Sequence, residues 1–178
     1  MVPGSSPGGP TNFYIMKTLS QQYFNEFNLR GKESEHKAAT WLRNFFKQKN
    51  LSRSIVDTSG VNTGIYRDKD NNQIPDLKVI NQETGEFYFV EIKQRKSYWY
   101  NNKRSFGVSE KFLKSYKNIS KKYECPVYIL FHDVESHPNT VFLVNVNQSP
   151  DGVMQYKNNW GAEPSYRWYI DNLKKFNI

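Results

Sequence analysis

The stretch of sequence that decides the fold runs from residue 75 to residue 94 and reads PDLKVINQETGEFYFVEIKQ. Two runs of β-forming residues, 75–81 and 86–94, flank a turn in which Gly85 supplies a positive φ. The pattern predicts a β-hairpin. Its second run is apolar enough to be a central strand of a sheet.

Charged residues interrupt this second run. Side chains alternate between the two faces of a strand, so Glu91 and Lys93 share a face with Phe89. The first run opens with Pro75-Asp76, and the hairpin brings Asp76 to the end that carries Glu91 and Lys93. Buried charges are costly unless they are paired or bind metal, and carboxylates are preferred ligands of hard cations such as Mg²⁺. The alternative is an exposed strand face with a cross-strand salt bridge.

The segments around the hairpin alternate between helix and strand. Helices are expected over 32–49 and 109–123, and strands over 52–58, 127–132 and 140–146. The second helix joins strand 86–94 to strand 127–132, so these two strands are expected to be parallel. The order predicts an α/β domain with a central mixed sheet flanked by helices.

Finer expectations concern the element ends and the chain termini. Ser109 is the expected N-cap of the second helix, whose apolar stripe is expected to comprise Phe112, Tyr116, Ile119 and Tyr123. A short helix is expected near 165–175. Residues 1–15, rich in Gly, Pro and Ser, are expected to be a disordered or cloning-derived lead-in. The expected single domain spans 16–178, with a core at 31–146 and an extension at 147–178.

The net charge of +8 on 178 residues is concentrated in one segment. Residues 93–122 contain ten Lys or Arg and one acid, which makes the segment +9 and leaves −1 for the rest of the chain. A concentrated basic segment is what a polyanion-binding surface needs, although a solvated lysine-rich helix would give the same count.

Basic and aromatic residues alternate directly after strand 86–94. Cations can neutralise phosphates and aromatic rings can stack on bases, so we expect this loop and the following helix to contact nucleic acid. The alternative is a surface loop whose rings pack on the protein. The candidates are Gln94, Arg95, Lys96, Tyr98, Trp99, Tyr100, Lys103, Arg104, Lys111 and Lys114.

A further carboxylate lies at the start of the first expected helix. At about 100° per residue, Glu35 falls in the middle of the apolar face, whereas Glu33 falls almost opposite. A carboxylate at the centre of an apolar face suggests a functional role. The alternative is a first-turn glutamate that is favoured by the helix dipole.

On these residues the chain resembles the PD-(D/E)XK nuclease superfamily, whose hallmark of Pro-Asp, a hairpin and then Asp/Glu-x-Lys is similar to Pro75-Asp76 and Glu91-Ile92-Lys93. The resemblance implies a restriction-endonuclease-like αβββαβ core. It also implies that Asp76, Glu91, the backbone carbonyl of Ile92 and Glu35 bind Mg²⁺, for which Mn²⁺ would substitute. Lys93 would then position the attacking water, which makes Asp76, Glu91, Lys93 and Glu35 the catalytic set.

The expected function is therefore a metal-dependent nuclease, with endonucleolytic cutting of DNA favoured over RNA. A structure-selective, repair, resolvase or phage enzyme is expected, and a homodimer is compatible with the resemblance. The alternatives are a non-catalytic nucleic-acid-binding module with this fold and a protein-binding domain with incidental charge. No apolar run of about 18 residues and no targeting segment is present, so a cytoplasmic protein without a membrane partner is expected.

Overall fold

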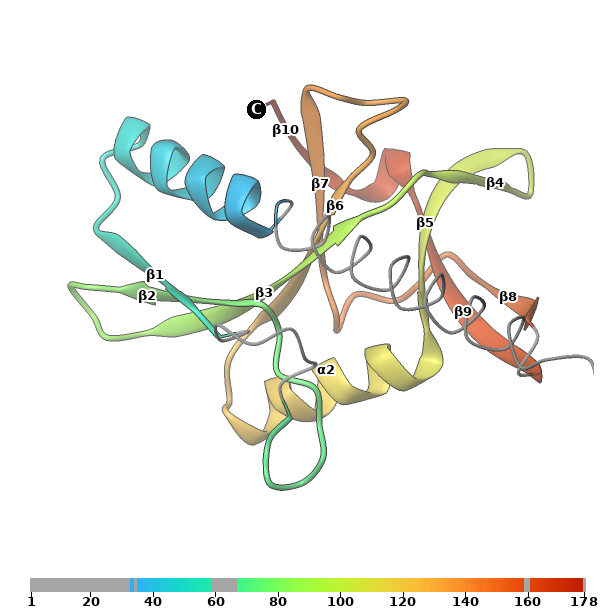
Figure 1. The fold of residues 1–178 in the computed structure, drawn as a ribbon, viewed down its shortest axis with the longest axis horizontal. Coiled ribbons are helices and arrows are strands. Elements are labelled where there is room, and N and C mark those ends of the chain that lie inside the picture. The colour runs from blue at the N-terminus through green and yellow to red at the C-terminus, as the bar shows by residue number, and fades with distance from the viewer. Residues whose placement is uncertain (1–32, 34, 59–66, 159–160, 178) are drawn as a thin grey trace, which may run out of the picture. The chain divides into compact units, whose positions relative to one another are not determined.

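The computed structural model describes residue 33 and residues 35–58, 67–158 and 161–177 (Figure 1). The chain divides into two compact units, residues 1–33 and residues 34–178. Apart from Glu33, all described residues lie in the second unit. The expectation of a disordered lead-in over residues 1–15 falls outside the described residues.

A six-stranded sheet forms the centre of the second unit. Strand β3 pairs with β6 in parallel, and the other neighbouring strands pair antiparallel, which confirms the mixed sheet and the parallel pair. In spatial order the strands are β1 (Arg53–Asp57), β2 (Leu77–Asn81), β3 (Phe87–Gln94), β6 (Val127–His132), β7 (Thr140–Asn145) and β10 (Lys174–Asn177).

The expected hairpin is formed by β2 and β3. Leu77 lies opposite Val90, and Ile80 lies opposite Phe87. Gly85 has a φ of 74°, a value that side chains disfavour, so the glycine allows the chain to reverse here. The prediction of the hairpin and of its turn is confirmed.

Two helices cover opposite faces of the sheet. The first helix spans residues 35–48, and Asn50 ends it with a φ of 51°. Helix α2 (Glu110–Lys122) begins after Ser109, whose position confirms the expected N-cap, although its side chain makes no capping hydrogen bond.

The apolar stripe of α2 differs from the prediction. Leu113, Tyr116 and Ile119 are buried, whereas Phe112 is half-buried and Tyr123 is 39% exposed. Phe112 still packs against the core cluster, as do Tyr116 and Ile119. The expected stripe is therefore confirmed for these three residues, was wrong in including the exposed Tyr123, and lacked Leu113.

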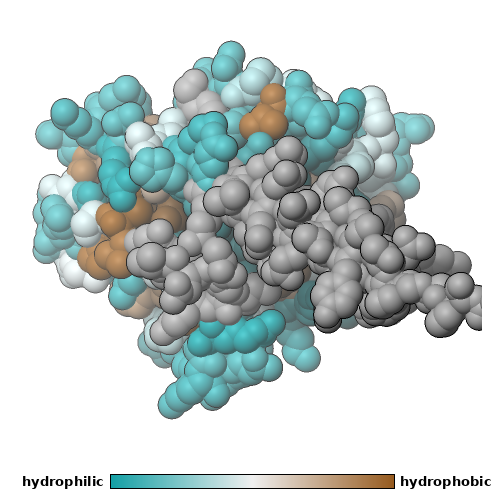
Figure 2. All heavy atoms as spheres, in the orientation of Figure 1, coloured by the Kyte–Doolittle hydropathy of each residue, from teal (hydrophilic) through white to brown (hydrophobic). Residues whose placement is uncertain are grey.

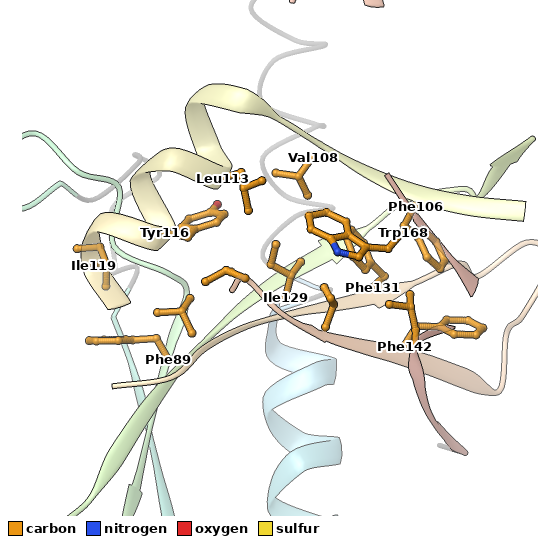
Figure 3. Packing of buried hydrophobic residues seen from close by; sticks show 14 of the residues in the cluster. Phe89, Phe106, Val108, Leu113, Tyr116, Ile119, Ile129, Phe131, Phe142 and Trp168 are labelled. Atoms are coloured by element: carbon orange, nitrogen blue, oxygen red, sulfur yellow. The ribbon is translucent and has the colours of Figure 1, made fainter. Parts of the chain in front are cut away.

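Each helix packs on its own hydrophobic cluster. The first helix packs through Leu42 and Phe46 against Val90 of β3. On the other face, Tyr116 and Ile119 of α2 join the cluster that contains Phe89, as Figure 3 shows. Strand β3 is thus covered on both faces, which explains its nearly continuous apolar sequence.

A second, four-stranded sheet lies beside this core and was not expected. The segment that follows Gln94, up to Arg104, was expected to be a loop but contains strand residues, and residues 165–169, expected to be helical, lie in a strand; both predictions were wrong there. The strands, in spatial order, are β4 (Tyr98–Tyr100), β5 (Lys103–Ser109), β9 (Gly161–Tyr169) and β8 (Gly152–Asn158). A 3-10 turn, Ile170–Asn172, leads from β9 to β10.

Alternation of side chains between the core and the opposite face explains why residues 161–169 form a strand. Trp168 is buried and Tyr166 packs partly against the core, while Arg167 and Tyr169 lie on the opposite face of the strand. Trp168 lies opposite Phe106 of β5 and packs in the core near Phe131 (Figure 3). A period of two favours strand over helix.

The loop before β2 is fastened to α2. Lys122 of α2 forms ion pairs with Asp68 and Asp70, and Asn118 donates a hydrogen bond of 3.0 Å to the side chain of Asn72. The backbone N–H of Gln73 donates to the Ser115 hydroxyl. These contacts hold the loop against the helix just before residues 75–76.

The element order matches the expected αβββαβ core, with one insertion. The first helix, β1, β2 and β3 are followed by the β4–β5 hairpin and only then by α2 and β6. Hydrophilic residues cover much of the described surface on the face shown in Figure 2. Among the described residues, no helix is both long enough and apolar enough to cross a bilayer.

Trp168→Ala should destabilise the protein by about 3–5 kcal/mol, because it removes a fully buried ring that joins the second sheet to the core. Urea unfolding followed by circular dichroism measures this. Val153→Ala on β8, where Val153 is 47% exposed, is the control and should cost less than about 1 kcal/mol. Equal losses in the two variants would contradict the assignment of Trp168 to the core.

Candidate active site

Asp76 lies at the open end of the β2–β3 hairpin. Its backbone carbonyl accepts a hydrogen bond of 2.9 Å from the N–H of Thr58, and Oδ2 accepts one of 2.7 Å from the N–H of Ile92. Extending the β2–β3 register by one step places Asp76 opposite Glu91. Neighbouring chain segments thus fix both the backbone carbonyl and the side-chain carboxylate of Asp76.

Glu91 and Lys93 form an ion pair on the face of β3 that α2 covers. Oε1 of Glu91 accepts a hydrogen bond from Nζ of Lys93. The Glu91 side chain is only 1% exposed and that of Lys93 is 16% exposed. The Lys93 ammonium also lies 5.4 Å from the ring centroid of Phe112. The structure therefore brings Asp76, Glu91 and Lys93 together.

Negative charge accumulates at this end of the hairpin. Burial and the nearby Glu91 carboxylate raise the pKa of Asp76 well above its usual value, and Glu35 raises it further. Lys93 and the Ile92 N–H act in the opposite direction. The three carboxylates together exceed the one ammonium, so the site favours an additional cation.

The two candidate glutamates of the first helix differ in exposure. Glu35 is half-buried and lies near enough to Asp76 to raise the pKa of that carboxyl. Glu33 is exposed. Glu35 can therefore act on the charged site directly.

Two buried polar atoms near this site make no hydrogen bond of good geometry among the described residues: Oε2 of Glu91 and the hydroxyl of Tyr116. Burial, the Glu91 charge and a hydrogen-bonding interaction with Glu91 raise the pKa of Tyr116 well above its usual value, so the two groups lie close to each other. A buried carboxylate oxygen without a partner is costly. Such an atom is suited to bind a further ligand.

The residues fit a hard divalent cation. Mg²⁺ is usually held by one or two carboxylates and completes its coordination with water and substrate oxygens. Asp76 and Glu91 supply the carboxylates, and Oε2 of Glu91, which makes no hydrogen bond of good geometry among the described residues, can act as a metal ligand. In the described part of the chain, no three His, Cys, Asp or Glu side chains form a ready-made metal cage. The site thus suits a cation that shares its ligands with substrate and water.

Asp133 anchors the segment that follows β3. It is fully buried after β6, where Oδ2 accepts hydrogen bonds of 2.8 and 2.7 Å from the N–H and hydroxyl of Ser97. Oδ1 accepts bonds from the N–H groups of Glu135 and Ser136. The chain from β3 to β4 is therefore held against the end of β6.

Several of the side chains predicted to contact nucleic acid are exposed on the surface. Tyr98 and Trp99 are 54% and 65% exposed, although large rings are usually buried. Arg95 is exposed at the end of β3, and Lys103 is exposed with Nζ 5.0 Å from the ring of Tyr169. These side chains are accessible to a ligand.

Other candidates are engaged within the protein. Lys96 pairs with Glu135, and the Tyr100 hydroxyl donates to the carbonyl of Val153. The Arg104 guanidinium donates a hydrogen bond of 3.0 Å to the carbonyl of Ser97, and its Cζ lies 4.9 Å from the ring centroid of Trp99. Among the remaining candidates, Gln94, Lys111 and Lys114 are exposed.

Three residues of the site region were not among the predictions for it. Asp133 directly follows the predicted strand 127–132, which was expected to be parallel to strand 86–94. The sequence could therefore have predicted that Asp133 lies near the end of strand 86–94. Tyr116 was assigned to an apolar stripe, which gave no sign of its hydroxyl. Arg167 was hidden because its segment was expected to be a helix.

Comparison with known proteins identifies one similar solved structure at low sequence identity. No protein-family model matches the chain, and no curated protein matches its sequence. Among solved structures, a Holliday junction resolvase, Hjc, from Archaeoglobus fulgidus is similar, with a TM-score of 0.40 and 10% sequence identity. The similarity covers 68% of this chain and 82% of that chain.

The Asp133 network predicts a pH dependence. Burial alone would raise the pKa of Asp133, but hydrogen bonds from Ser136 and Ser97 lower it to about 2, from an ordinary value of 3.8. A depressed folded-state pKa contributes stability that is present above pH 3.8 and is lost as the pH falls toward 2. The contribution is about 2 kcal/mol.

Asp133→Asn should therefore be less stable than the wild type at pH 6, and the gap should narrow between pH 4 and pH 2. Urea unfolding of both proteins across that pH range measures the difference. Asp171→Asn on the 3-10 turn, whose side chain is 82% exposed, is the matched control. A stability gap that does not change with pH would contradict the low pKa.

Proposed function

We propose that this protein is a metal-dependent nuclease that hydrolyses phosphodiester bonds, with DNA as the favoured substrate and cutting within the strand. The observation that carries the proposal is the convergence of Asp76, Glu91 and Lys93 at the open end of the β2–β3 hairpin, with one buried Glu91 oxygen that makes no hydrogen bond of good geometry among the described residues. The resemblance of Pro75-Asp76 and Glu91-Ile92-Lys93 to the PD-(D/E)XK pattern supports the same assignment.

Mg²⁺ is the proposed cofactor, and Mn²⁺ should replace it. Asp76 and Glu91 would hold the ion, together with the backbone carbonyl of Ile92 and with Glu35. When bound, the ion neutralises phosphate charge and makes a water molecule more acidic. The excess of carboxylates over the single ammonium supports the binding of a cation at this point.

The protein's own groups have separate roles. The Ile92 N–H fixes one oxygen of Asp76, and Glu91 fixes the Lys93 ammonium. Lys93 can then orient the attacking water and stabilise the developing charge on phosphate. The water oxygen bonds to phosphorus and the water loses a proton, the P–O bond to the leaving sugar oxygen breaks, and that oxygen takes up a proton, so that one water is consumed overall.

The substrate class requires a direct test. Duplex, single strand, flap, four-way junction and RNA, each incubated with Mg²⁺ or Mn²⁺ and with EDTA, separate structure-selective, repair, resolvase and phage types of nuclease. Retained binding without cutting of any substrate would instead favour a non-catalytic nucleic-acid-binding module.

Lys93→Met and Asp76→Asn should each reduce cleavage by at least about a hundredfold, because each removes a group that acts on the reacting phosphate or on its cation. Initial rates on the best substrate of the panel measure the loss, and circular dichroism checks the fold. Lys175→Met on β10, whose side chain is 48% exposed, is the matched control and should cut normally. Normal cutting by Lys93→Met would refute the mechanism.

Glu35→Gln should raise the Mg²⁺ concentration needed for half-maximal cleavage, because it removes a carboxylate near Asp76. Glu33→Gln makes the same change two residues away, at an exposed position, and should leave the Mg²⁺ dependence unchanged. Metal titrations of the cleavage rate compare the two variants. The role of Glu35 would be excluded by two identical titration curves.

A further inference from the structure

Arg167 of β9 is a buried cation with no ion pair among the described residues. It is only 6% exposed, and its Nε is buried without a hydrogen-bond partner. The contacts of its guanidinium are a long hydrogen bond of 4.0 Å to the sulfur of Met154 and the ring of Tyr98, whose centroid lies 5.7 Å away. Buried arginines usually pair with a carboxylate or another anion.

The surrounding chain makes room for this guanidinium. Gly107 of β5 lies opposite Arg167. A Cβ atom on Gly107 would lie 2.7 Å from Cζ of Arg167, so the guanidinium lies across the space that a side chain at 107 would fill. The position of Arg167 therefore depends on the glycine.

Arg167 lies on the face of the second sheet opposite to the core. The register places Tyr98 opposite Ser105 and Tyr100 opposite Lys103, so these side chains share the face of Gly107 and Arg167. Tyr169 lies on this face too, with its ring 6.2 Å from that of Tyr100. The face combines two cations with three tyrosines, and we call it the tyrosine–arginine face (Tyr98, Tyr100, Lys103, Arg167 and Tyr169).

Arg95 connects this face to the candidate active site. It is exposed just after β3, between Lys93 and Tyr98 on the chain, and the ring of Tyr98 lies against Arg167. Burial lowers the pKa of Arg167, and the charge of Arg95 lowers it further. No ion pair between either guanidinium and a carboxylate is found among the described residues, an arrangement that an anion stabilises.

We infer that Arg167, with Arg95, binds a backbone phosphate of the nucleic-acid substrate beside the scissile bond. Arginine suits this role because its planar guanidinium can donate two hydrogen bonds to one phosphate. The exposed ring of Tyr98 covers the guanidinium and is available to an adjacent base or sugar. This inference rests on the proposed function and adds a positioning residue to it.

A purely structural role for Arg167 makes the opposite prediction about stability. A cation that holds the sheet together would destabilise the protein when removed. A buried cation without an ion pair instead costs stability, and methionine of similar length relieves that cost. Arg167→Met should therefore melt at the wild-type temperature or higher, while it binds DNA less tightly.

DNA affinity is best measured by fluorescence anisotropy in the Lys93→Met background with Mg²⁺, so that the DNA stays intact. Adding Arg167→Met should weaken binding roughly tenfold. It should also lower the slope of log affinity against log salt by about 0.9 on duplex, as expected for one lost phosphate contact. Arg167→Lys should lose less, because it keeps the charge.

Two further variants sharpen this test. Gly107→Ala leaves Arg167 in the chain but displaces its guanidinium, and it should weaken binding in the same direction. Arg43→Met on the first helix removes an exposed arginine and should change neither affinity nor salt slope. Unchanged affinity and slope in Arg167→Met, or a fall in its melting temperature, would overturn the inference.

Inorganic phosphate separates this inference from the proposed function. Phosphate should raise the melting temperature of the wild type more than that of Arg167→Met, whether or not the protein cuts nucleic acid. A wild type that cuts no substrate but shows this difference would refute the nuclease proposal and retain the anion site. Equal shifts in both proteins would refute the anion site alone.

Discussion

Strand β3 is covered on both faces and still carries the carboxylate of Glu91 in its middle. The contacts around this buried charge depend on that constraint. Val90 packs toward the first helix and Phe89 toward α2, so Glu91 has little access to water. Lys93 compensates part of its charge, and the adjoining Ile92 N–H holds Asp76. Because burial makes charges costly, the residues at the end of this strand must be tightly organised.

The molecule contains two centres of opposite charge that lack full compensation. Carboxylates dominate at Asp76 and Glu91, whereas Arg167 on the second sheet is a buried cation without an ion pair among the described residues. Under the proposed function a metal ion compensates the first centre and a phosphate the second. Bound nucleic acid, with its metal ion, would then balance both charged centres of the free protein. Contacts at the metal and at Arg167 would fix its position.

The sequence predicted the parts of the fold that depend on local patterns. Hairpin 75–94 and the crossover helix were identifiable because turn chemistry, strand composition and helical spacing agree there. The second sheet was missed because β4 has three residues and because β9, which pairs with β5, lies about 60 residues further along the chain. Arg167 depends on that long-range pairing, so no local pattern around it indicated its burial.

The insertion of β4 and β5 between β3 and α2 has a consequence for synthesis. Strand β5 is synthesised well before its neighbour β9. Until β9 is made, the β4–β5 hairpin therefore has an unpaired edge along β5. During that interval the nascent chain is open to non-native strand pairing or to capture by a chaperone. The α2–β6 crossover can form first, which makes closure of the small sheet a late step in folding.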